Sequence, residues 1–309
     1  MTTLEETNLI IQKEEENERI DKLLSSRFAK KSRNYFQYLI QEGCVFRNGE
    51  KVRKRDLLKE GDEIEVFFRL SPELSLEPEN IPLDILFEDE HILVVNKPAG
   101  MVVHPAPGNW NQTFVNALLH HCQNLPTSQD ESRPGIVHRL DKNTSGILIA
   151  AKTTLAHQKL IEAFQEKKIE KTYLAICIGK PPNGVIQQPI GRDPRYRKKM
   201  RVSEEGKPAQ TKCHILAFND KMSLVQLNPI TGRTHQLRVH MKYCKTPILG
   251  DEVYGNASLN KAFEATRQCL HAYQIKLSHP VFQTPLHFVA PLPNDLKKWI
   301  LQISAETPS

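Results

Sequence analysis

The sequence predicts an α+β fold, in which a mixed, largely antiparallel central sheet with flanking helices follows a small N-terminal α/β domain. Three observations support this prediction. Short apolar runs outnumber helical patterns, the two kinds of segment do not alternate as in a parallel β-α-β fold, and 309 residues suit about two domains. With 39% hydrophobic and 25% charged residues, the chain can bury a core without disulfides or metals.

Residues 17–70 are predicted to form the small domain. Apolar residues recur at helical spacing over its first part, and a second helix is predicted between Ser32 as N-cap and Gly43 as stop signal. Asn48-Gly49 lies between the segments Cys44–Phe46 and Lys51–Arg53, which is a strong signal for a two-residue hairpin. Residues 63–68 alternate apolar and polar side chains as a half-buried strand does.

Charge and proline divide the rest of the chain. Residues 1–16 carry five Glu and one Lys, so we expect an acidic, disordered leader. Residues 71–83 hold three prolines, which is typical of a linker. The larger domain is then expected to span residues 84–303, and residues 304–309 to form a short tail.

Beyond the linker, five apolar runs of strand length favour buried strands. They cover residues 85–87, 92–95, 147–151, 173–178 and 223–227. Four segments with helical spacing lie between or after these runs, at residues 113–122, 153–168, 234–243 and 295–303. Because runs and helical segments do not alternate regularly, we expect the strands to pair mostly antiparallel.

Composition excludes several classes of protein. No stretch approaches 18 consecutive apolar residues, and residues 1–18 lack the apolar segment of a secretory signal, so we expect a cytoplasmic protein. The six cysteines form no C-x-x-C pair, which argues against a disulfide framework and a zinc knuckle. The net charge of +6 permits a polyanionic partner without requiring one.

One loop carries most of the chemical information. His138-Arg139-Leu140-Asp141 and Thr144-Ser145-Gly146 form a charged cluster that lies before an apolar run and ends in small polar residues. Such a loop can present one carboxylate from a rigid sheet, and Asp141 is the candidate. Taken alone, the pattern also fits a surface ion pair between Asp141 and its basic neighbours.

The loop resembles the signature of the RluA/RluD family of pseudouridine synthases. Further segments extend the resemblance over about residues 84–303: Asn96-Lys97-Pro98, Lys171-Thr172-Tyr173, Thr231-Gly232-Arg233-Thr234-His235-Gln236-Leu237-Arg238-Val239-His240, Gly250-Asp251 and Leu270-His271-Ala272. The resemblance implies the pseudouridine synthase fold and an isomerase that converts uridines of RNA to pseudouridines. The pattern is most similar to the RluC/RluD branch of the family.

The N-terminal unit carries a resemblance of its own. Arg19-Ile20-Asp21, Ser32-Arg33, Asn48-Gly49 and Gly61-Asp62 follow one another as in the small RNA-binding domain named after a small-subunit ribosomal protein. This implies RNA binding, with Arg33 as a candidate contact. Together the two resemblances imply large-subunit ribosomal RNA as substrate and a role in ribosome biogenesis, with transfer RNA as the alternative.

The resemblance implies roles for four residues of the catalytic domain. Asp141 would act under the sugar, either by covalent attack or by assisting the loss of uracil. Arg238 would supply its countercharge, although by spacing alone it would be a surface helix residue. Tyr173, otherwise a core residue, would stack on the base and help to remove the proton from carbon 5. Arg139 is expected to face the RNA beside a flipped-out nucleotide.

A basic stretch from Arg192 to Arg201 is either a solvated loop or a contact with RNA phosphates. Its candidate contacts are Arg195, Arg197, Lys198 and Lys199.

No cofactor is expected, because isomerisation involves no net redox change and the chain has no phosphate-binding glycine loop. No metal site is expected either, since neither His120-His121 nor the pair His235 and His240 has suitable ligand spacing. We expect a monomer. Two other functions stay open at this point, a non-catalytic RNA-binding protein and an aspartate-dependent nucleosidase.

Overall fold

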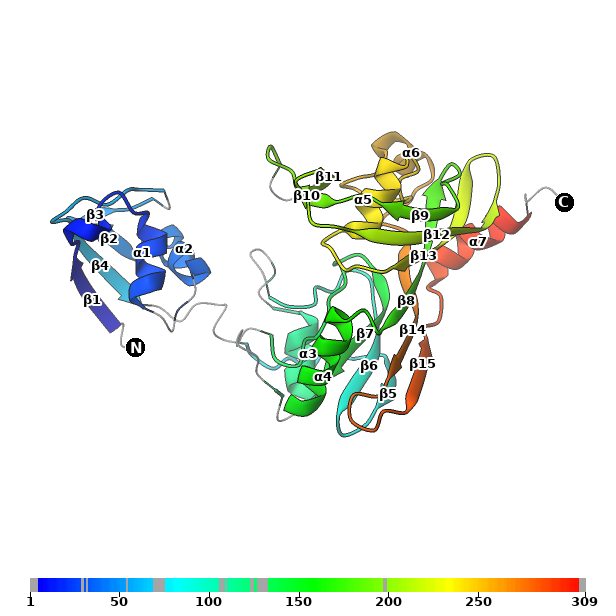
Figure 1. The fold of residues 1–309 in the computed structure, drawn as a ribbon, viewed down its shortest axis with the longest axis horizontal. Helices are drawn as coiled ribbons and strands as arrows, with labels where there is room; N and C mark the ends of the chain where they lie inside the picture. Colours follow the sequence, from blue (N-terminus) through cyan, green and yellow to red (C-terminus); the bar gives the residue numbers. More distant parts are fainter. Residues whose placement is uncertain are drawn as a thin grey trace. The chain divides into compact units, whose positions relative to one another are not determined.

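The computed structural model describes residues 5–28, 31, 33–53, 55–68, 76–105, 109, 111–122, 125–126, 133–196 and 199–305. The chain divides into two compact units, residues 1–77 and residues 78–309 (Figure 1). Unit 1 has one hydrophobic core, and unit 2 has several clusters of buried side chains on the two faces of its sheet.

Unit 1 combines two helices with a four-stranded antiparallel sheet (Figure 1). Its elements are β1 (Glu5–Ile10), the 3-10 turn η1 (Lys13–Glu15), α1 (Ile20–Arg27), α2 (Arg33–Gln41), β2 (Val45–Arg47), β3 (Glu50–Lys51) and β4 (Glu63–Phe68), with strand order β1-β4-β2-β3. Asn48 and Gly49 have φ angles of 52° and 78°, as the predicted hairpin turn requires. Phe36 and Leu39 of α2 are fully buried in the same cluster as Ile64 of β4.

Strand β1 shows that the expectation of a disordered leader over residues 1–16 was wrong for Glu5–Ile10. β1 pairs antiparallel with β4 along its whole length, and Ile11, which follows it, is buried. The charge count missed this strand because backbone pairing does not depend on side-chain charge. The added strand gives hydrogen-bond partners to backbone groups of β4 that would otherwise lie at a sheet edge.

Unit 2 is built on a nine-stranded sheet, which confirms the predicted α+β fold. Its order is β5-β6-β7-β14-β8-β13-β12-β9, with β15 paired to β14. The strands are β5 (Ile85–Glu88), β6 (Ile92–Lys97), β7 (Ser145–Ala151), β8 (Glu170–Ile178), β9 (Gly184–Gln187), β12 (Gln210–Phe218), β13 (Met222–Pro229), β14 (Leu270–Ser278) and β15 (Pro285–Val289). Among the described residues, the strand pairings are antiparallel except that between β7 and β14.

Helices pack on both faces of this sheet. They are α3 (Phe114–His121), α4 (Thr154–Gln165), α5 (Gln236–Tyr243), α6 (Ala257–Ala262) and α7 (Asn294–Ala305). Alternate residues of β7 belong to the cluster of α4 and to that of α3, while β8 and β13 are covered by α5 on one face and α7 on the other. Strands covered on both faces are apolar throughout, which is why continuous apolar runs predicted them.

Two strands that sequence patterns missed, β12 and β15, are less completely covered. Every second residue of β12 and β15 is exposed or partly exposed, so neither strand forms a continuous apolar run. A separate two-stranded sheet of β10 (Ile190–Arg192) and β11 (Met200–Val202) carries the basic stretch. Helix α7 continues to Ala305, two residues into the predicted tail.

In the described part of the chain, no helix is long and apolar enough to cross a bilayer. All six cysteines are free thiols, and five of them are buried.

Candidate active site

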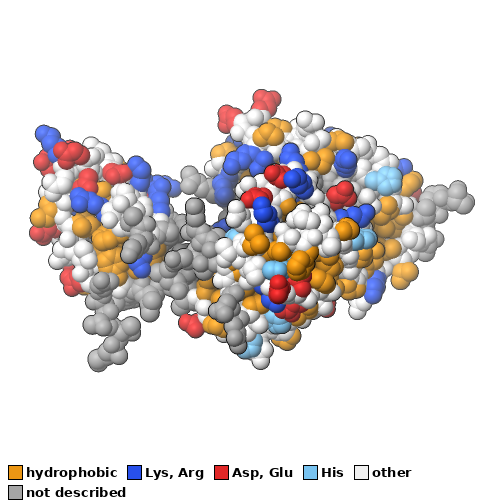
Figure 2. All heavy atoms as spheres, turned by 60° about the horizontal axis from the view of Figure 1, so that its bottom comes forward, with side chains coloured by type: hydrophobic (Ala, Val, Ile, Leu, Met, Phe, Trp, Pro, Cys, Tyr) orange, Lys and Arg blue, Asp and Glu red, His pale blue; other side chains and the backbone are white. Residues whose placement is uncertain are grey.

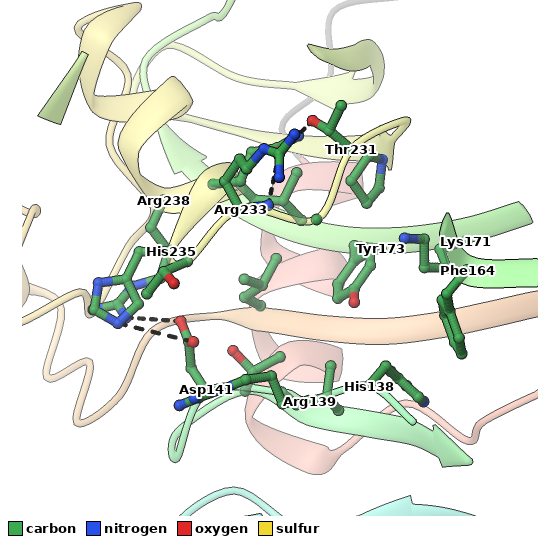
Figure 3. A pocket seen from close by; sticks show the side chains of 18 of the residues that line it. His138, Arg139, Asp141, Phe164, Lys171, Tyr173, Thr231, Arg233, His235 and Arg238 are labelled. Atoms are coloured by element: carbon green, nitrogen blue, oxygen red, sulfur yellow. Dashed lines mark hydrogen bonds and ion pairs between the residues drawn. The ribbon is translucent and has the colours of Figure 1, made fainter. Parts of the chain in front are cut away.

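A pocket of about 350 Å³ lies where four segments of unit 2 meet (Figure 3). Its lining residues come from the loop before β7, from the region of α4 and β8, from the segment between β13 and α5, and from the start of β14. His235 and Arg238 approach Asp141 from one side, and Lys171, Phe164 and His138 lie at the opposite end (Figure 3). The predicted residues Asp141, Tyr173, Arg238 and Arg139 therefore line one cavity.

The loop that bears Asp141 is held close to the sheet. Gly146 of β7 has a φ angle of +107°, and a Cβ at this position would clash with the carbonyl oxygen of Ala272 in β14. Only glycine fits both the backbone angle and this close approach of the strands. The Thr144-Ser145-Gly146 segment thus fixes where the Asp141 loop joins the sheet.

Arg238 joins Asp141 to a second carboxylate. Its Nη1 donates to Asp141 Oδ2 at 2.8 Å, while Nε and Nη2 donate to Asp251 at 2.7 and 3.0 Å. The Arg238 side chain is 6% exposed, so it is not a surface helix residue. Burial alone would lower the pKa of Arg238, but the hydrogen bond and charge of Asp251 together with Asp141 raise it above its usual range. The guanidinium is a permanent, oriented positive charge beside Asp141.

Asp251 holds Arg238 in this orientation. Burial opposes its charge, yet the hydrogen bonds and charge of Arg238 and two backbone N–H donors keep the pKa of Asp251 below its ordinary value. The ring of Tyr254 lies 5.0 Å from the Arg238 guanidinium carbon and adds a cation–π contact. The sequence motif contained Gly250-Asp251, but only the fold shows that Asp251 contacts Arg238.

His235 is a second side chain near Asp141, which the sequence analysis considered only as a possible metal ligand. Its Nε2 lies 3.9 Å from Asp141 Oδ1, and its Nδ1 lies 2.8 Å from Tyr254 Oη. The residue adopts a left-handed conformation (φ 56°, ψ 19°) just before α5. The motif match places His235 in the right segment, but its direction toward Asp141 follows from the backbone of the folded loop.

Tyr173 and Lys171 project from the same face of β8, since they are two residues apart. Burial and the neighbouring Asp141 charge raise the pKa of Tyr173, so its hydroxyl is protonated at neutral pH. Lys171 Nζ lies 5.7 Å from the centre of the Phe164 ring, and His138 stacks on the same ring at 4.7 Å. This end of the pocket offers aromatic faces and one partly buried cation.

Lys97 holds the Asp141 loop in place through hydrogen bonds, a role that the sequence analysis did not assign. Its side chain is buried, and Nζ donates to the carbonyl oxygens of Pro98, Met101 and Lys142 at 2.8, 2.9 and 3.2 Å. Burial lowers the pKa of Lys97 to about 7, against the opposing effect of Asp141. The bond to Lys142 ties the residue next to Asp141 to the loop after β6.

His138 leads to a prediction for the pH dependence of stability. The Ile149 N–H donates to its Nε2 at 2.9 Å, so the ring is neutral, and burial with the nearby Lys171 lowers its pKa to about 3. Below pH 6.5, the ordinary pKa of histidine, His138 binds a proton in the unfolded chain but stays neutral in the folded chain. We therefore expect the free energy of unfolding to fall as the pH falls from 6.5 toward 3.

Urea unfolding at pH 7 and at pH 5 measures this effect. The His138→Gln variant, which can still accept the Ile149 N–H, should lose less stability between the two pH values than the parent. An equal loss in both proteins would show that His138 does not contribute.

The remaining candidates for RNA contact lie in different places. Arg139 is exposed at the pocket, and Arg195 and Lys199 flank the turn between β10 and β11. Arg197 and Lys198 lie outside the described residues. Arg33 of unit 1 donates to Asp21 from Nε and Nη2 at 3.0 and 3.2 Å, and it keeps a 43% exposed side chain. RNA contact by these residues stays a prediction.

One group in the described part of the chain has side chains that could share a metal ion. The possible ligand atoms of Glu88, His121 and Cys122 lie within 4.8 Å of one another. However, the Glu88 carboxylate already accepts from Lys152 Nζ at 2.6 Å and contacts His121 Nε2 at 2.8 Å. These three residues line no part of the pocket.

Comparison with known proteins adds to this picture. The family described as RNA pseudouridylate synthase matches residues 91–243, and the S4 domain family matches residues 18–64. The uncharacterized RNA pseudouridine synthase YlyB of Bacillus subtilis is 40% identical over 96% of this chain and 98% of its own length. Ribosomal large subunit pseudouridine synthase D of Neisseria meningitidis serogroup A is 41% identical over 90% and 76%.

Solved structures named as RNA pseudouridylate synthase domain proteins are also similar to this chain. The structure of human RNA pseudouridylate synthase domain containing 1 has a TM-score of 0.56 and 25% identity, and the similarity covers 76% of this chain and 98% of that one. Human RNA pseudouridylate synthase domain containing 4 has a TM-score of 0.55 and 27% identity over 71% and 92%.

Proposed function

The chain belongs to the RNA pseudouridylate synthase family, and from this premise we propose that it isomerises specific uridines of large-subunit ribosomal RNA to pseudouridine. The observation that carries the proposal is the Asp141 carboxylate, which faces a nucleotide-sized pocket with Arg238 Nη1 bound to one oxygen at 2.8 Å. In this arrangement one carboxylate oxygen, Oδ2, is oriented by a buried cation, and the other, Oδ1, makes no hydrogen bond to Arg238.

The proposed roles follow from the chemistry of the isomerisation. The bond from ribose C1′ to N1 of uracil breaks, a bond from C1′ to C5 forms, the C5 proton leaves and N1 gains a proton. We assign Asp141 to the sugar, where it attacks C1′ or assists departure of the base. Arg238 stabilises the charge of Asp141, and Tyr173 stacks on the base while uracil turns.

Two features support RNA of the large ribosomal subunit as substrate. Relatives about 40% identical over most of the chain are named for that activity, and the S4 domain match coincides with unit 1. Figure 2 shows Lys and Arg side chains on the drawn faces of both units. We further propose that the protein acts in the cytoplasm as a monomer.

Mapping pseudouridines in cells with and without this protein tests the proposal. We expect loss of one or a few sites in large-subunit ribosomal RNA and no change in transfer RNA. Purified protein should restore the same sites on an unmodified transcript and release tritium from uridine labelled at C5. Loss confined to transfer RNA would support the alternative substrate, and free uracil as product would indicate a nucleosidase.

Deletion of unit 1 gives a second prediction. Unit 2 has its own core, so a chain of residues 78–309 should remain folded. The deletion also removes the 13 Lys and Arg side chains of residues 17–70, so it should weaken binding to ribosomal RNA roughly tenfold at physiological salt and reduce the steepness of the salt dependence. Filter binding over a range of salt concentrations measures both quantities. An unchanged dissociation constant and slope would show that unit 1 does not bind this RNA.

A further inference from the structure

We propose that His235 and Asp141 together hold the 2′-hydroxyl of the target uridine, so that His235 makes the enzyme select ribose over deoxyribose. This inference rests on the function proposed above and extends it to the recognition of the sugar.

The separation of the two groups fits a bridging hydroxyl. Asp141 Oδ2 accepts a hydrogen bond from Arg238, while Oδ1 faces His235 Nε2 at 3.9 Å. This distance is too long for a direct hydrogen bond. An oxygen at about 2.8 Å from both atoms would span the gap with an angle of roughly 90° at that oxygen. Both side chains are partly exposed, 21% for His235 and 22% for Asp141, so a substrate group can reach them.

The hydrogen bonds behind His235 determine which ring nitrogen carries the proton. The backbone N–H of Met200 donates to Tyr254 Oη at 2.8 Å, and Tyr254 Oη lies 2.8 Å from His235 Nδ1. Tyr254 is buried, and in the described part of the chain its hydroxyl has these two partners alone. Its proton is satisfied only if it is donated to His235 Nδ1, because a buried unpaired O–H is costly.

His235 therefore carries its proton on Nε2, the atom that faces Asp141. Burial lowers the pKa of His235, which favours this neutral form. The left-handed backbone and the T-shaped contact of the ring with Tyr254, at 5.6 Å between centroids, hold the side chain in place. The site thus presents one donor, Nε2–H, and one acceptor, Oδ1, to the same point.

A 2′-hydroxyl matches this donor and acceptor pair. Inside an RNA chain the 3′ and 5′ oxygens are esterified, so the 2′-hydroxyl is the one hydroxyl on the ribose, and it both donates and accepts. It is bonded to the carbon next to C1′, where Asp141 is proposed to act. DNA lacks the group, and a 2′-O-methyl group cannot donate to Oδ1.

The test compares two RNAs that differ in a single oxygen atom. Each spans a mapped target uridine and carries C5-tritiated uridine or C5-tritiated 2′-deoxyuridine at that position. Single-turnover tritium release is measured for the parent, for His235→Ala and for Tyr254→Phe, which removes the hydroxyl but keeps the ring that contacts Arg238. His287→Ala, on the exposed face of β15, is the matched control for loss of a histidine.

For His235→Ala we expect the rate on the ribose substrate to fall about tenfold, with the rate on the deoxyribose substrate little changed. The ratio of the two rates therefore falls about tenfold relative to the parent. Tyr254→Phe should lower this ratio by a smaller factor, roughly threefold, and His287→Ala should not change it. Dividing the rates removes the intrinsic effect of the 2′ substituent on the glycosidic bond, because that effect is common to all variants.

An equal fall of both rates in His235→Ala would overturn the inference, since it would show a structural role only. For a 2′-fluoro substrate, which keeps the ribose pucker but cannot donate, the rate of His235→Ala relative to the parent should be little changed, as for the deoxyribose substrate. If His235→Ala lowers the rate on the 2′-fluoro substrate about tenfold, as on the ribose substrate, then His235 senses sugar pucker rather than the hydroxyl, and the inference is wrong. Absence of tritium release by the parent on the ribose substrate would instead refute the proposed function itself.

Discussion

Replacing Asp141 with asparagine should lower the rate of pseudouridine formation by at least about 10³-fold. Asparagine has nearly the same shape and can still accept a hydrogen bond from Arg238, but it can neither attack C1′ as a carboxylate nor accept a proton. The loss would therefore report on chemistry rather than on packing. Tritium release from C5-labelled RNA under single-turnover conditions measures the rate.

The fold and RNA affinity of Asp141→Asn should stay close to those of the parent. Arg238 keeps Asp251 as a partner, so no buried charge is left alone. Asp220→Asn, at an exposed position between β12 and β13, serves as the matched control and should retain full activity. If Asp141→Asn isomerised uridine at more than a few per cent of the parent rate, the assignment of Asp141 would have to be abandoned.

The second large effect concerns Arg238, whose loss should affect activity and stability together. In Arg238→Met, Asp251 becomes a buried carboxylate without its ion pair, which is expected to cost about 3–5 kcal/mol of folding free energy. Asp141 also loses its oriented countercharge, and we expect the rate to fall roughly 10²- to 10³-fold. Urea unfolding and single-turnover kinetics measure the two quantities.

A double variant separates the two roles of Arg238. In Arg238→Met with Asp251→Asn the unpaired carboxylate is gone, and the amide oxygen can still accept the N–H groups of Val253 and Tyr254. Stability should largely return while the rate stays low. Recovery of the rate together with stability would mean that Arg238 acts only by holding the fold.

Much of the fold could be predicted because several signals are local. A strand covered on both faces needs apolar side chains at every position, so β6, β7, β8 and β13 are visible as continuous runs. The hairpin at Asn48-Gly49 is equally local, since positive φ angles at two successive residues favour this pair. Strand β1 escaped prediction because its partner β4 is more than fifty residues away and pairs through backbone atoms.

The candidate site shows the same division between local and distant information. The motifs indicated Asp141, Tyr173 and Arg238 one by one, and they also contain Lys97, His235 and Asp251. They could not indicate that Arg238 bridges two carboxylates or that Lys97 ties down Lys142, because these contacts join loops from different strands. The contact from Met200 through Tyr254 to His235 spans three segments with no common motif.

By itself, the sequence determined the α+β class, most of the helices and buried strands, and the residue types available for chemistry. These properties depend on side-chain pattern and on short-range backbone preference, which can be read along the chain. The tertiary structure alone decided which groups share a cavity, which charges are buried and paired, and which ring nitrogen of His235 faces Asp141. These properties depend on distances of a few ångströms between residues far apart in sequence, and such distances are set only when the sheet and its helices pack together.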